Sequence, residues 1–138
     1  STKTLYLSSR ICPEKEKYIH LYPCDDLINN VAIPTGISSS YSENGDHLFS
    51  VTVLNDKISE DDLIDGVMKR LKDYYGGDKG DYKFLKRFDI KKGTLRQLPG
   101  YFDNQTTQNG DVIITGEHQT NGSIEGAIIS GIEAANFI

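Results

Sequence analysis

The sequence lacks three features, and each absence excludes a class of protein. None of its 138 residues belongs to an apolar run of 18 or more, so no segment is long enough to cross a membrane as a helix. It has only two cysteines, at a spacing that matches no standard zinc module, which excludes a disulfide scaffold and a zinc finger. It has 15 basic residues against 20 acidic ones, which argues against a protein that binds nucleic acid by neutralising phosphates.

The glycine pattern excludes two further motifs. None of the 13 glycines lies two positions from another, so the G-x-G-x-x-G finger of dinucleotide-binding domains is absent. No glycine precedes Lys-Ser or Lys-Thr, so there is no P-loop either. The first residues also lack the apolar core of a signal peptide. We therefore expect a cytoplasmic protein, free or peripheral to a membrane, in which Cys12 and Cys24 are free thiols.

Alternating apolar residues predict several antiparallel strands. Residues 3–9 and 17–22 both alternate, and Pro13 lies between them, which indicates a hairpin or meander. In the second of these segments, Ile19 and Leu21 are expected on one face, opposite the flanking tyrosines and histidine. Further strands are predicted over residues 28–33, 47–54 and 82–90.

The most regular pattern predicts a long amphipathic helix over residues 59–75. Ser59 followed by Asp62 resembles a capping box, and Gly76-Gly77 is a typical helix end. The apolar residues recur at steps of three and four, which places them on one stripe: Leu63, Ile64, Val67, Met68, Leu71, Tyr74 and Tyr75. Strands together with this helix predict an α+β fold, an antiparallel sheet with one long helix.

The end of the chain predicts a strand, a turn and a helix. Residues 112–114 form a short apolar run that indicates a buried strand, and residues 100–110 before it are expected to be a loop. A helix is expected from about Ser123 onward, with small and apolar residues packing against a sheet. That packing face consists of Ile124, Ala127, Ile128, Gly131, Ile132 and Ala135. We therefore divide the chain into residues 1–110 and residues 111–138.

This strand–turn–helix unit is the strongest candidate for a binding site. Free N–H groups at the helix start, near Ser123 and Ile124, carry partial positive charge and can hold an anion or an oxygen that gains negative charge. Glu117, just past the strand, can accept hydrogen bonds from sugar or polyol hydroxyls. Three glycines would let a flat ligand approach the backbone: Gly116, Gly122 and Gly126. The alternative is structural, with Asn121 or Ser123 as a helix cap and Glu117 solvated.

The same segment resembles the C-terminal flavin motif of FAD-dependent amine oxidases and phytoene-desaturase-like oxidoreductases. Residues 114–117 (Ile-Thr-Gly-Glu) and 121–135 are similar to the family's apolar strand, its Gly-Thr-Glu type turn and its Ser-x-x-Gly-Ala-x-x-Ser-Gly-x-x-Ala-Ala helix. Upstream, residues 28–54 resemble strands of the family's substrate domain. Leu98-Pro99 resembles the dipeptide that precedes the return to the flavin domain. The resemblance therefore covers nearly the whole chain.

The resemblance implies the C-terminal portion of an FAD-dependent oxidoreductase. Residues 1–110 would belong to the substrate domain, and residues 111–138 would complete a Rossmann-like FAD domain. Glu117 would contact the ribityl or pyrophosphate region of FAD. The helix start at Ser123 and Ile124 would face the N1 and C2-carbonyl edge of the flavin ring, which gains negative charge on reduction. Gly116, Gly122 and Gly126 would allow close approach.

The expected partners follow from the same resemblance. They are a small amine or apolar substrate and the missing N-terminal FAD-binding portion, and a homo-oligomer is compatible with the sequence. Because the glycine finger is absent, the chain alone should hold FAD weakly or not at all. We expect no metal ligand set, and no catalytic residue can be named.

Two other functions stay open. The chain could be a stand-alone, non-catalytic binding or structural module, in which the C-terminal unit serves a partner or the fold. It could also be a small enzyme that uses His118 and Glu117 as acid and base. That second alternative needs a third, orienting group, which the sequence does not indicate.

Overall fold

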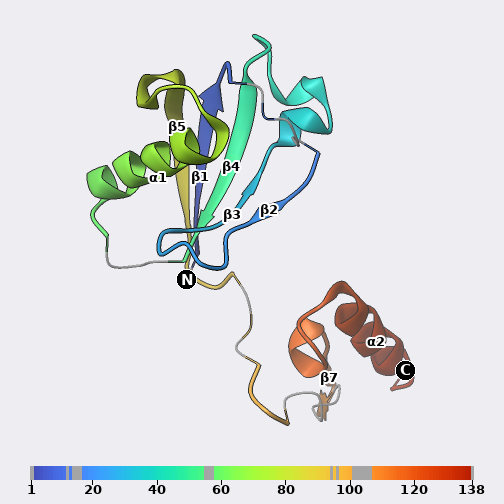
Figure 1. The fold of residues 1–138 in the computed structure, drawn as a ribbon. Coiled ribbons are helices and arrows are strands. Elements are labelled where there is room, and N and C mark those ends of the chain that lie inside the picture. Colours follow the sequence, from blue (N-terminus) through green and yellow to red (C-terminus); the bar gives the residue numbers. More distant parts are fainter. Residues whose placement is uncertain are drawn as a thin grey trace. The chain divides into compact units, whose positions relative to one another are not determined.

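The computed structural model describes residues 2–11, 13, 17–54, 58–93, 95, 97–100 and 107–137, with the backbone alone for 107–109. The chain divides into two compact units, residues 1–93 and residues 94–138 (Figure 1). The first unit holds a five-stranded antiparallel sheet and helix α1, and the second holds a two-stranded hairpin and helix α2. The predicted α+β class is confirmed. The assignment of residues 1–110 and 111–138 to a substrate domain and an FAD domain stays a prediction.

The sheet of the first unit has the strand order β2-β3-β4-β1-β5. Its strands are β1 (Thr2–Ser9), β2 (His20–Leu21), β3 (Ile28–Ala32), β4 (His47–Val53) and β5 (Tyr82–Ile90). Strand β1 pairs with β4 along one edge and with β5 along the other. The predicted hairpin or meander of β1 with the segment that follows it is therefore wrong, because both edges of β1 are taken by strands from much later in the chain.

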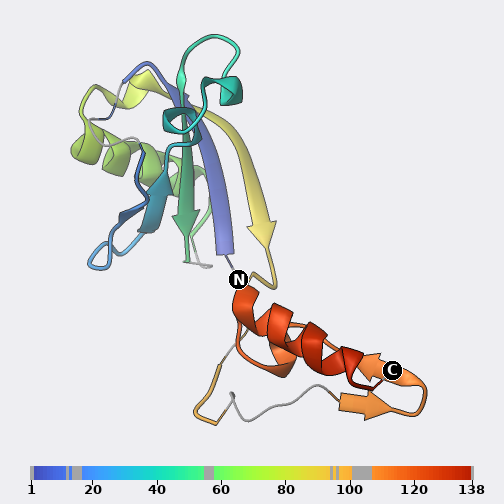
Figure 2. The same ribbon diagram turned by 90° about the vertical axis from the view of Figure 1, so that its right-hand side faces the viewer.

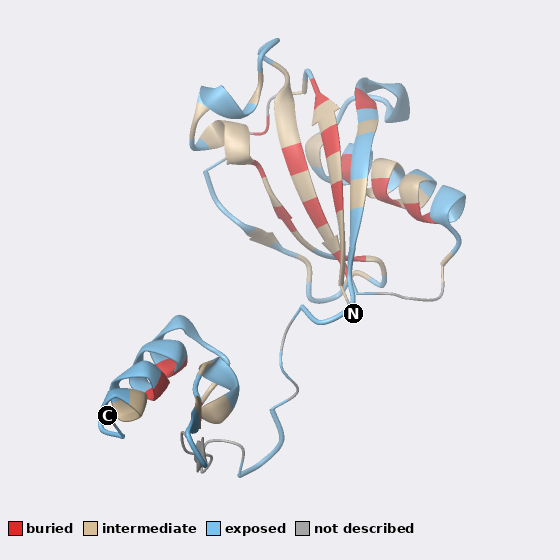
Figure 3. Cartoon of the chain, turned by 180° about the vertical axis from the view of Figure 1, so that it is seen from behind, coloured by how far each residue is buried: buried red, intermediate tan, exposed pale blue. Residues whose placement is uncertain are grey.

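Helix α1 (Glu60–Tyr75) covers one face of this sheet (Figure 2). The Ser59 hydroxyl accepts a hydrogen bond from the Asp62 N–H and caps the helix start, and Gly76, at a φ of 84°, follows its last residue. The predicted helix is thus confirmed. Its buried residues, Leu63, Val67 and Leu71, join a core formed with Leu5, Leu7, Ile28, Val31, Ile33, Phe49, Val51, Val53 and Tyr82. Figure 3 shows the alternating buried bands along the strands.

The predicted alternation around β2 is present, and the aliphatic residues take the outer side. Ile19 and Leu21 are exposed, whereas His20 and Tyr22 are half-buried toward α1. Nδ1 of His20 lies 2.5 Å from the Tyr75 hydroxyl, and the Tyr22 hydroxyl donates to the same oxygen over 3.0 Å. Because α1 satisfies the polar ends of these two rings, they take the inward side in place of the aliphatic residues.

Aromatic side chains pack the C-terminal end of α1 against the sheet. Tyr22 and Tyr74 stack with ring centroids 4.1 Å apart, and Phe49 makes edge contacts with Tyr75 and Tyr82 at 5.4 Å and 5.6 Å. The Tyr82 hydroxyl donates to two carbonyl groups at the end of α1. Aromatic pairs stabilise a fold by more than the area they bury accounts for. The C-terminal end of α1 is therefore held to the sheet by several contacts.

The second unit contains a hairpin of β6 (Thr107–Asn109) and β7 (Val112–Ile114), followed by α2 (Ile124–Ala135). The hairpin turn places Gly110 at a φ of 60°. Strand β7 and the start of α2 confirm the predicted elements, but β6 lies where a loop was predicted. The expectation that β7 is buried is wrong for the described chain: Val112 and Ile114 are exposed, and Ile113 between them is only half-buried.

Four 3₁₀ helices complete the described elements. They are η1 (Pro34–Gly36), η2 (Ser39–Tyr41), η3 (Lys79–Asp81) and η5 (Glu117–Gln119).

Candidate functional site

The predicted site residues all lie in the continuous segment from the end of β7 into α2. Gly116 precedes η5, Glu117 begins it, and both Glu117 and His118 are exposed. Ser123 is the residue before α2 and Ile124 is its first residue. Because η5 packs against α2, the structure brings the turn and the helix into one compact unit. The contact of these residues with a ligand stays a prediction.

The start of α2 is capped and still offers hydrogen-bond donors. Ser123 Oγ accepts from the Gly126 N–H over 2.9 Å and donates to the Asn121 side chain. The capping role considered for Ser123 is therefore confirmed. The N–H groups of Ile124 and Glu125 come before the first intrahelical bond and have no acceptor among the described residues. Two donors at the positive end of the helix dipole thus face outward from the cap.

Helix α2 is fixed to the preceding turn by buried polar groups that sequence analysis missed. Ser130 is fully buried; its hydroxyl lies 2.9 Å from Thr115 Oγ1 and accepts from the Gly116 N–H over 3.0 Å. The Thr120 hydroxyl donates to the Gly126 carbonyl over 2.7 Å. The available signal was the four-residue spacing of Gly126 and Ser130, two small residues on one helix face. These contacts hold the turn that carries the candidate residues.

The predicted packing face of α2 is wrong within the described chain. Ile124 and Ile132 are 85% and 63% exposed, and a Cβ added to Gly131 would meet no atom within 4 Å. The helix packs instead through Gly126 and Ser130, on its other side. That side is favoured because its buried hydroxyl satisfies a backbone N–H of the turn. An apolar stripe of α2 is consequently left uncovered by the described residues.

Two of the three candidate glycines meet structural demands of the unit itself. Gly116 has a φ of 138°, which residues with a side chain rarely adopt. A Cβ on Gly126 would lie 2.0 Å from the Asn121 carbonyl oxygen, so this glycine permits a backbone contact between helix and turn. Gly122 is exposed beside the Gln97 side chain. Whether these positions also admit a ligand stays a prediction.

Replacing Ser130 by alanine should destabilise the second unit by about 1–3 kcal/mol, because the Gly116 N–H loses its buried acceptor. Amide hydrogen exchange of Gly116 should accelerate correspondingly. The control is Thr115→Val, which removes only the hydroxyl partner of Ser130 and should have the smaller effect. Equal exchange rates at Gly116 in the wild type and in Ser130→Ala would show that this contact does not hold the turn.

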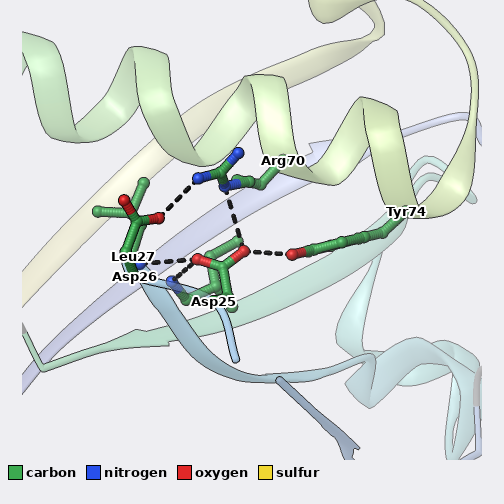
Figure 4. Close-up of polar contacts among 6 residues, drawn as sticks. Asp25, Asp26, Leu27, Arg70 and Tyr74 are labelled. Atoms are coloured by element: carbon green, nitrogen blue, oxygen red, sulfur yellow. Dashed lines mark hydrogen bonds and ion pairs between the residues drawn. The ribbon is translucent and has the colours of Figure 1, made fainter. Parts of the chain in front are cut away.

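A second polar cluster joins α1 to the segment before β3 in the first unit (Figure 4). Asp25 Oδ1 accepts from the N–H groups of Leu27 and Ile28, at 2.7 Å and 2.8 Å. Its Oδ2 accepts from the Tyr74 hydroxyl and lies 3.1 Å from Arg70 Nε in an ion pair. The cluster borders a cavity of about 470 Å³. No sequence pattern marks these residues as a cluster, because α1 and the segment before β3 are distant in the chain.

Asp25 acts as a structural clamp between α1 and the segment before β3. Both carboxylate oxygens are engaged, by three hydrogen bonds and by the ion pair with Arg70. Burial alone would raise the pKa of Asp25. The hydrogen bonds from Tyr74, Ile28 and Leu27 and the charge of Arg70 together outweigh this effect, so the pKa lies below its ordinary value. Burial and the bond to Asp25 raise the pKa of Tyr74 to about 12, which keeps its hydroxyl a donor.

The remaining sequence predictions concern cysteine, metal and membrane. Cys24 is an exposed free thiol, and Cys12 lies outside the described residues. Within the described ranges, no group of three or more His, Cys, Asp or Glu side chains is placed to hold a metal ion. In the same part of the chain, neither helix combines the length and the apolar character needed to cross a bilayer.

Comparison with known families places the chain in the class of flavin-containing oxidoreductases. A family model described as flavin-containing amine oxidoreductase matches residues 22–138, which include most of the sheet, α1 and the whole candidate segment. The chain belongs to this family. A search of curated proteins found no match. The resemblance to amine oxidases is thus confirmed, and a flavin cofactor is implied for complete members.

Proposed function

We propose that this chain is the C-terminal part of an FAD-dependent oxidoreductase, similar to amine oxidases and phytoene desaturases, that oxidises an amine or apolar substrate. The observation that carries the proposal is the family match over residues 22–138. When bound, the flavin accepts the electrons removed from the substrate, and the protein supplies orientation and electrostatics. The chain alone should hold FAD weakly or not at all, since it lacks the glycine finger.

The residues of the candidate segment fit such a cofactor. The Glu117 carboxylate is exposed and has no ion pair among the described residues, so it can accept hydrogen bonds from the ribityl hydroxyls. The N–H groups of Ile124 and Glu125 are donors without an acceptor in the described chain, at the positive end of α2. Acceptors and donors on one compact turn suit a ligand that carries both hydroxyls and carbonyl oxygens.

The uncovered apolar surface of the second unit supports a larger parent domain. Ile124, Ile128 and Ile132 form an exposed stripe at helical spacing, and Val112 and Ile114 of β7 are exposed as well. An exposed apolar stripe on a helix is a common feature of an interaction site. We infer that residues 111–138 contribute the last strand and helix of a Rossmann-like FAD domain, whose remainder is an N-terminal FAD-binding portion.

The direct test is the coding sequence upstream of residue 1 and the colour of its product. We expect an upstream strand followed by G-x-G-x-x-G, and a full-length protein that is yellow as purified. A colourless full-length product that does not take up added FAD would overturn the proposal. A reading frame that begins at Ser1, directly after a start Met, would favour the stand-alone module instead.

In the full-length protein, Glu117→Ala should weaken FAD binding by roughly tenfold, the effect of losing one hydrogen bond to a charged acceptor. The measurement is reconstitution of the apoprotein with FAD, followed by quenching of FAD fluorescence. Glu43→Ala, which removes an exposed carboxylate in the first unit, is the control and should leave the affinity unchanged. Equal affinities for Glu117→Ala and the wild type would place the cofactor contact elsewhere.

A further inference from the structure

An apolar cavity of about 440 Å³ opens at the β2 edge of the sheet in the first unit. One wall is the chain that leads into β2, and the other is the turn of η1 and η2 after β3. Its lining includes Lys17, Tyr18, Ile19, Ile33, Ile37 and Tyr41. None of these residues belongs to the candidate flavin segment or to the Asp25 clamp.

The cavity exists because two neighbouring chain segments diverge at this edge. The ladder between β2 and β3 contains only the pairs His20–Val31 and Leu21–Asn30, so Tyr18 and Ile19 precede it. On the other side, Ile33 follows β3 and Pro34 then begins η1, where the extended strand ends. The side chains that face the gap stay accessible, and Ile37 is 72% exposed.

The chemistry of the lining differs from that of the other described cavities. Among its described lining residues, the single charged group is the Lys17 ammonium, and the other polar side-chain groups are the hydroxyls of Tyr18 and Tyr41. The other two described cavities are both bordered by carboxylates, one by a pair of aspartates and the other by a glutamate and an aspartate. A described lining with one ammonium group and no carboxylate favours an anion over a cation.

We propose that this cavity binds a small carboxylic acid with an apolar body. The carboxylate would pair with Lys17, assisted by the tyrosine hydroxyls, and the apolar body would lie against Ile33 and Ile37. A cavity of this volume and composition is within the range of small-molecule sites, which are largely apolar with a few polar groups that fix orientation. One ammonium balances a single negative charge, whereas a phosphate monoester brings roughly 1.5 to 2.

The first test compares two amphiphiles with the same chain and opposite charge, decanoate and decyltrimethylammonium, below their micelle concentrations. Both compounds are titrated into the 138-residue chain while its backbone amide NMR signals are recorded. Decanoate should shift the signals of Ile33 and Ile37. It should bind about fivefold tighter than the cation, which is the affinity that one accessible ion pair contributes. Lys17→Glu should reverse this preference. The matched control, Lys69→Glu on the exposed side of α1, should leave it unchanged.

A second variant tests the apolar half of the site. Ile37→Glu places a charge at an exposed turn position, so the fold should persist while decanoate binding falls by more than about tenfold. Leu54→Glu, at an exposed position outside the cavity, is the control and should bind decanoate like the wild type. Absence of decanoate binding, or equal binding of both amphiphiles unaffected by Lys17→Glu, overturns the proposal. So does concentration-dependent self-association that Ile37→Glu abolishes, since a second copy would then fill the cavity.

Discussion

Gly126→Ala should separate the turn before α2 from the helix and destabilise the second unit by about 3 kcal/mol, the upper range of overpacking. The added Cβ would lie 2.0 Å from the Asn121 carbonyl oxygen and 2.7 Å from Thr120 Oγ1. The first of these atoms belongs to the backbone and cannot rotate away as the end of a side chain could. The measurements are urea unfolding followed by circular dichroism, and amide exchange across residues 115–121, which should accelerate.

The same helix offers a matched control for this substitution. A Cβ added to Gly131 would meet no atom within 4 Å. Gly131→Ala should therefore stabilise α2 by about 0.5–1 kcal/mol, because alanine loses less backbone entropy than glycine in a helix. If both alanine variants were equally stable, the close contact between Asn121 and the helix would be wrong. In the full-length protein, Gly126→Ala should also lower FAD retention, since it displaces the turn that carries Glu117.

Asp25→Ala should lower the free energy of unfolding of the first unit by about 3 kcal/mol, as expected when a buried, multiply bonded charge is removed. The substitution leaves the N–H groups of Leu27 and Ile28 and the hydroxyl of Tyr74 without their acceptor, and it leaves Arg70 without its buried partner. Urea unfolding of the full chain, followed by the tyrosine signal, measures the loss.

The neighbouring aspartate provides the control, because both carboxylates pair with Arg70. The Asp26 side chain is 84% exposed and that of Asp25 only 4%, and Asp26 Oδ1 lies 2.6 Å from Arg70 Nη2. Asp26→Ala should cost about 0.5 kcal/mol, the usual worth of an exposed ion pair. Similar losses in the two variants would show that burial and the backbone bonds of Asp25 do not matter.

The Asp25 clamp also sets a pH dependence with a definite sign. The folded-state pKa of Asp25 lies below its ordinary value of 3.8. The stabilisation that Asp25 provides is therefore complete above pH 3.8 and is lost as the pH falls through the folded-state pKa. The pKa of Tyr74 is raised from 10.0 to about 12, so its contribution is complete below pH 10 and is lost as the pH rises through about 12. Asp25→Asn should remove the acid limb of the stability profile, and Tyr74→Phe the alkaline limb.

Elements determined by local sequence were predictable. Helix α1 follows from its apolar stripe, from the Ser59 cap and from Gly76, and α2 begins at the residue after Ser123 as expected. Each of these signals acts within a few residues of the element, so no knowledge of the rest of the chain is needed. The position of the candidate flavin segment was accessible for the same reason, since its motif is a continuous stretch.

Features that depend on distant residues were not predictable. Strand β1 pairs with strands that begin at His47 and Tyr82. The alternation of apolar and polar residues predicts a strand but does not indicate which other strand it pairs with. The inward side of the β2 segment is decided by Tyr75, and the Asp25 clamp depends on Tyr74, 49 residues further along the chain. The role of Ser130 was not predictable either. A single hydroxyl in an apolar helix does not indicate that the preceding turn packs against that helix.

The stacked tyrosines at the end of α1 give the first unit an optical signature of its own. The chain has eight tyrosines and no tryptophan, and seven of the tyrosines precede residue 94. Near-ultraviolet dichroism and tyrosinate absorbance therefore report almost entirely on residues 1–93, whereas far-ultraviolet dichroism sums α1 and α2. Recording both signals in one unfolding experiment would resolve whether the two units melt together or one after the other, without an added label.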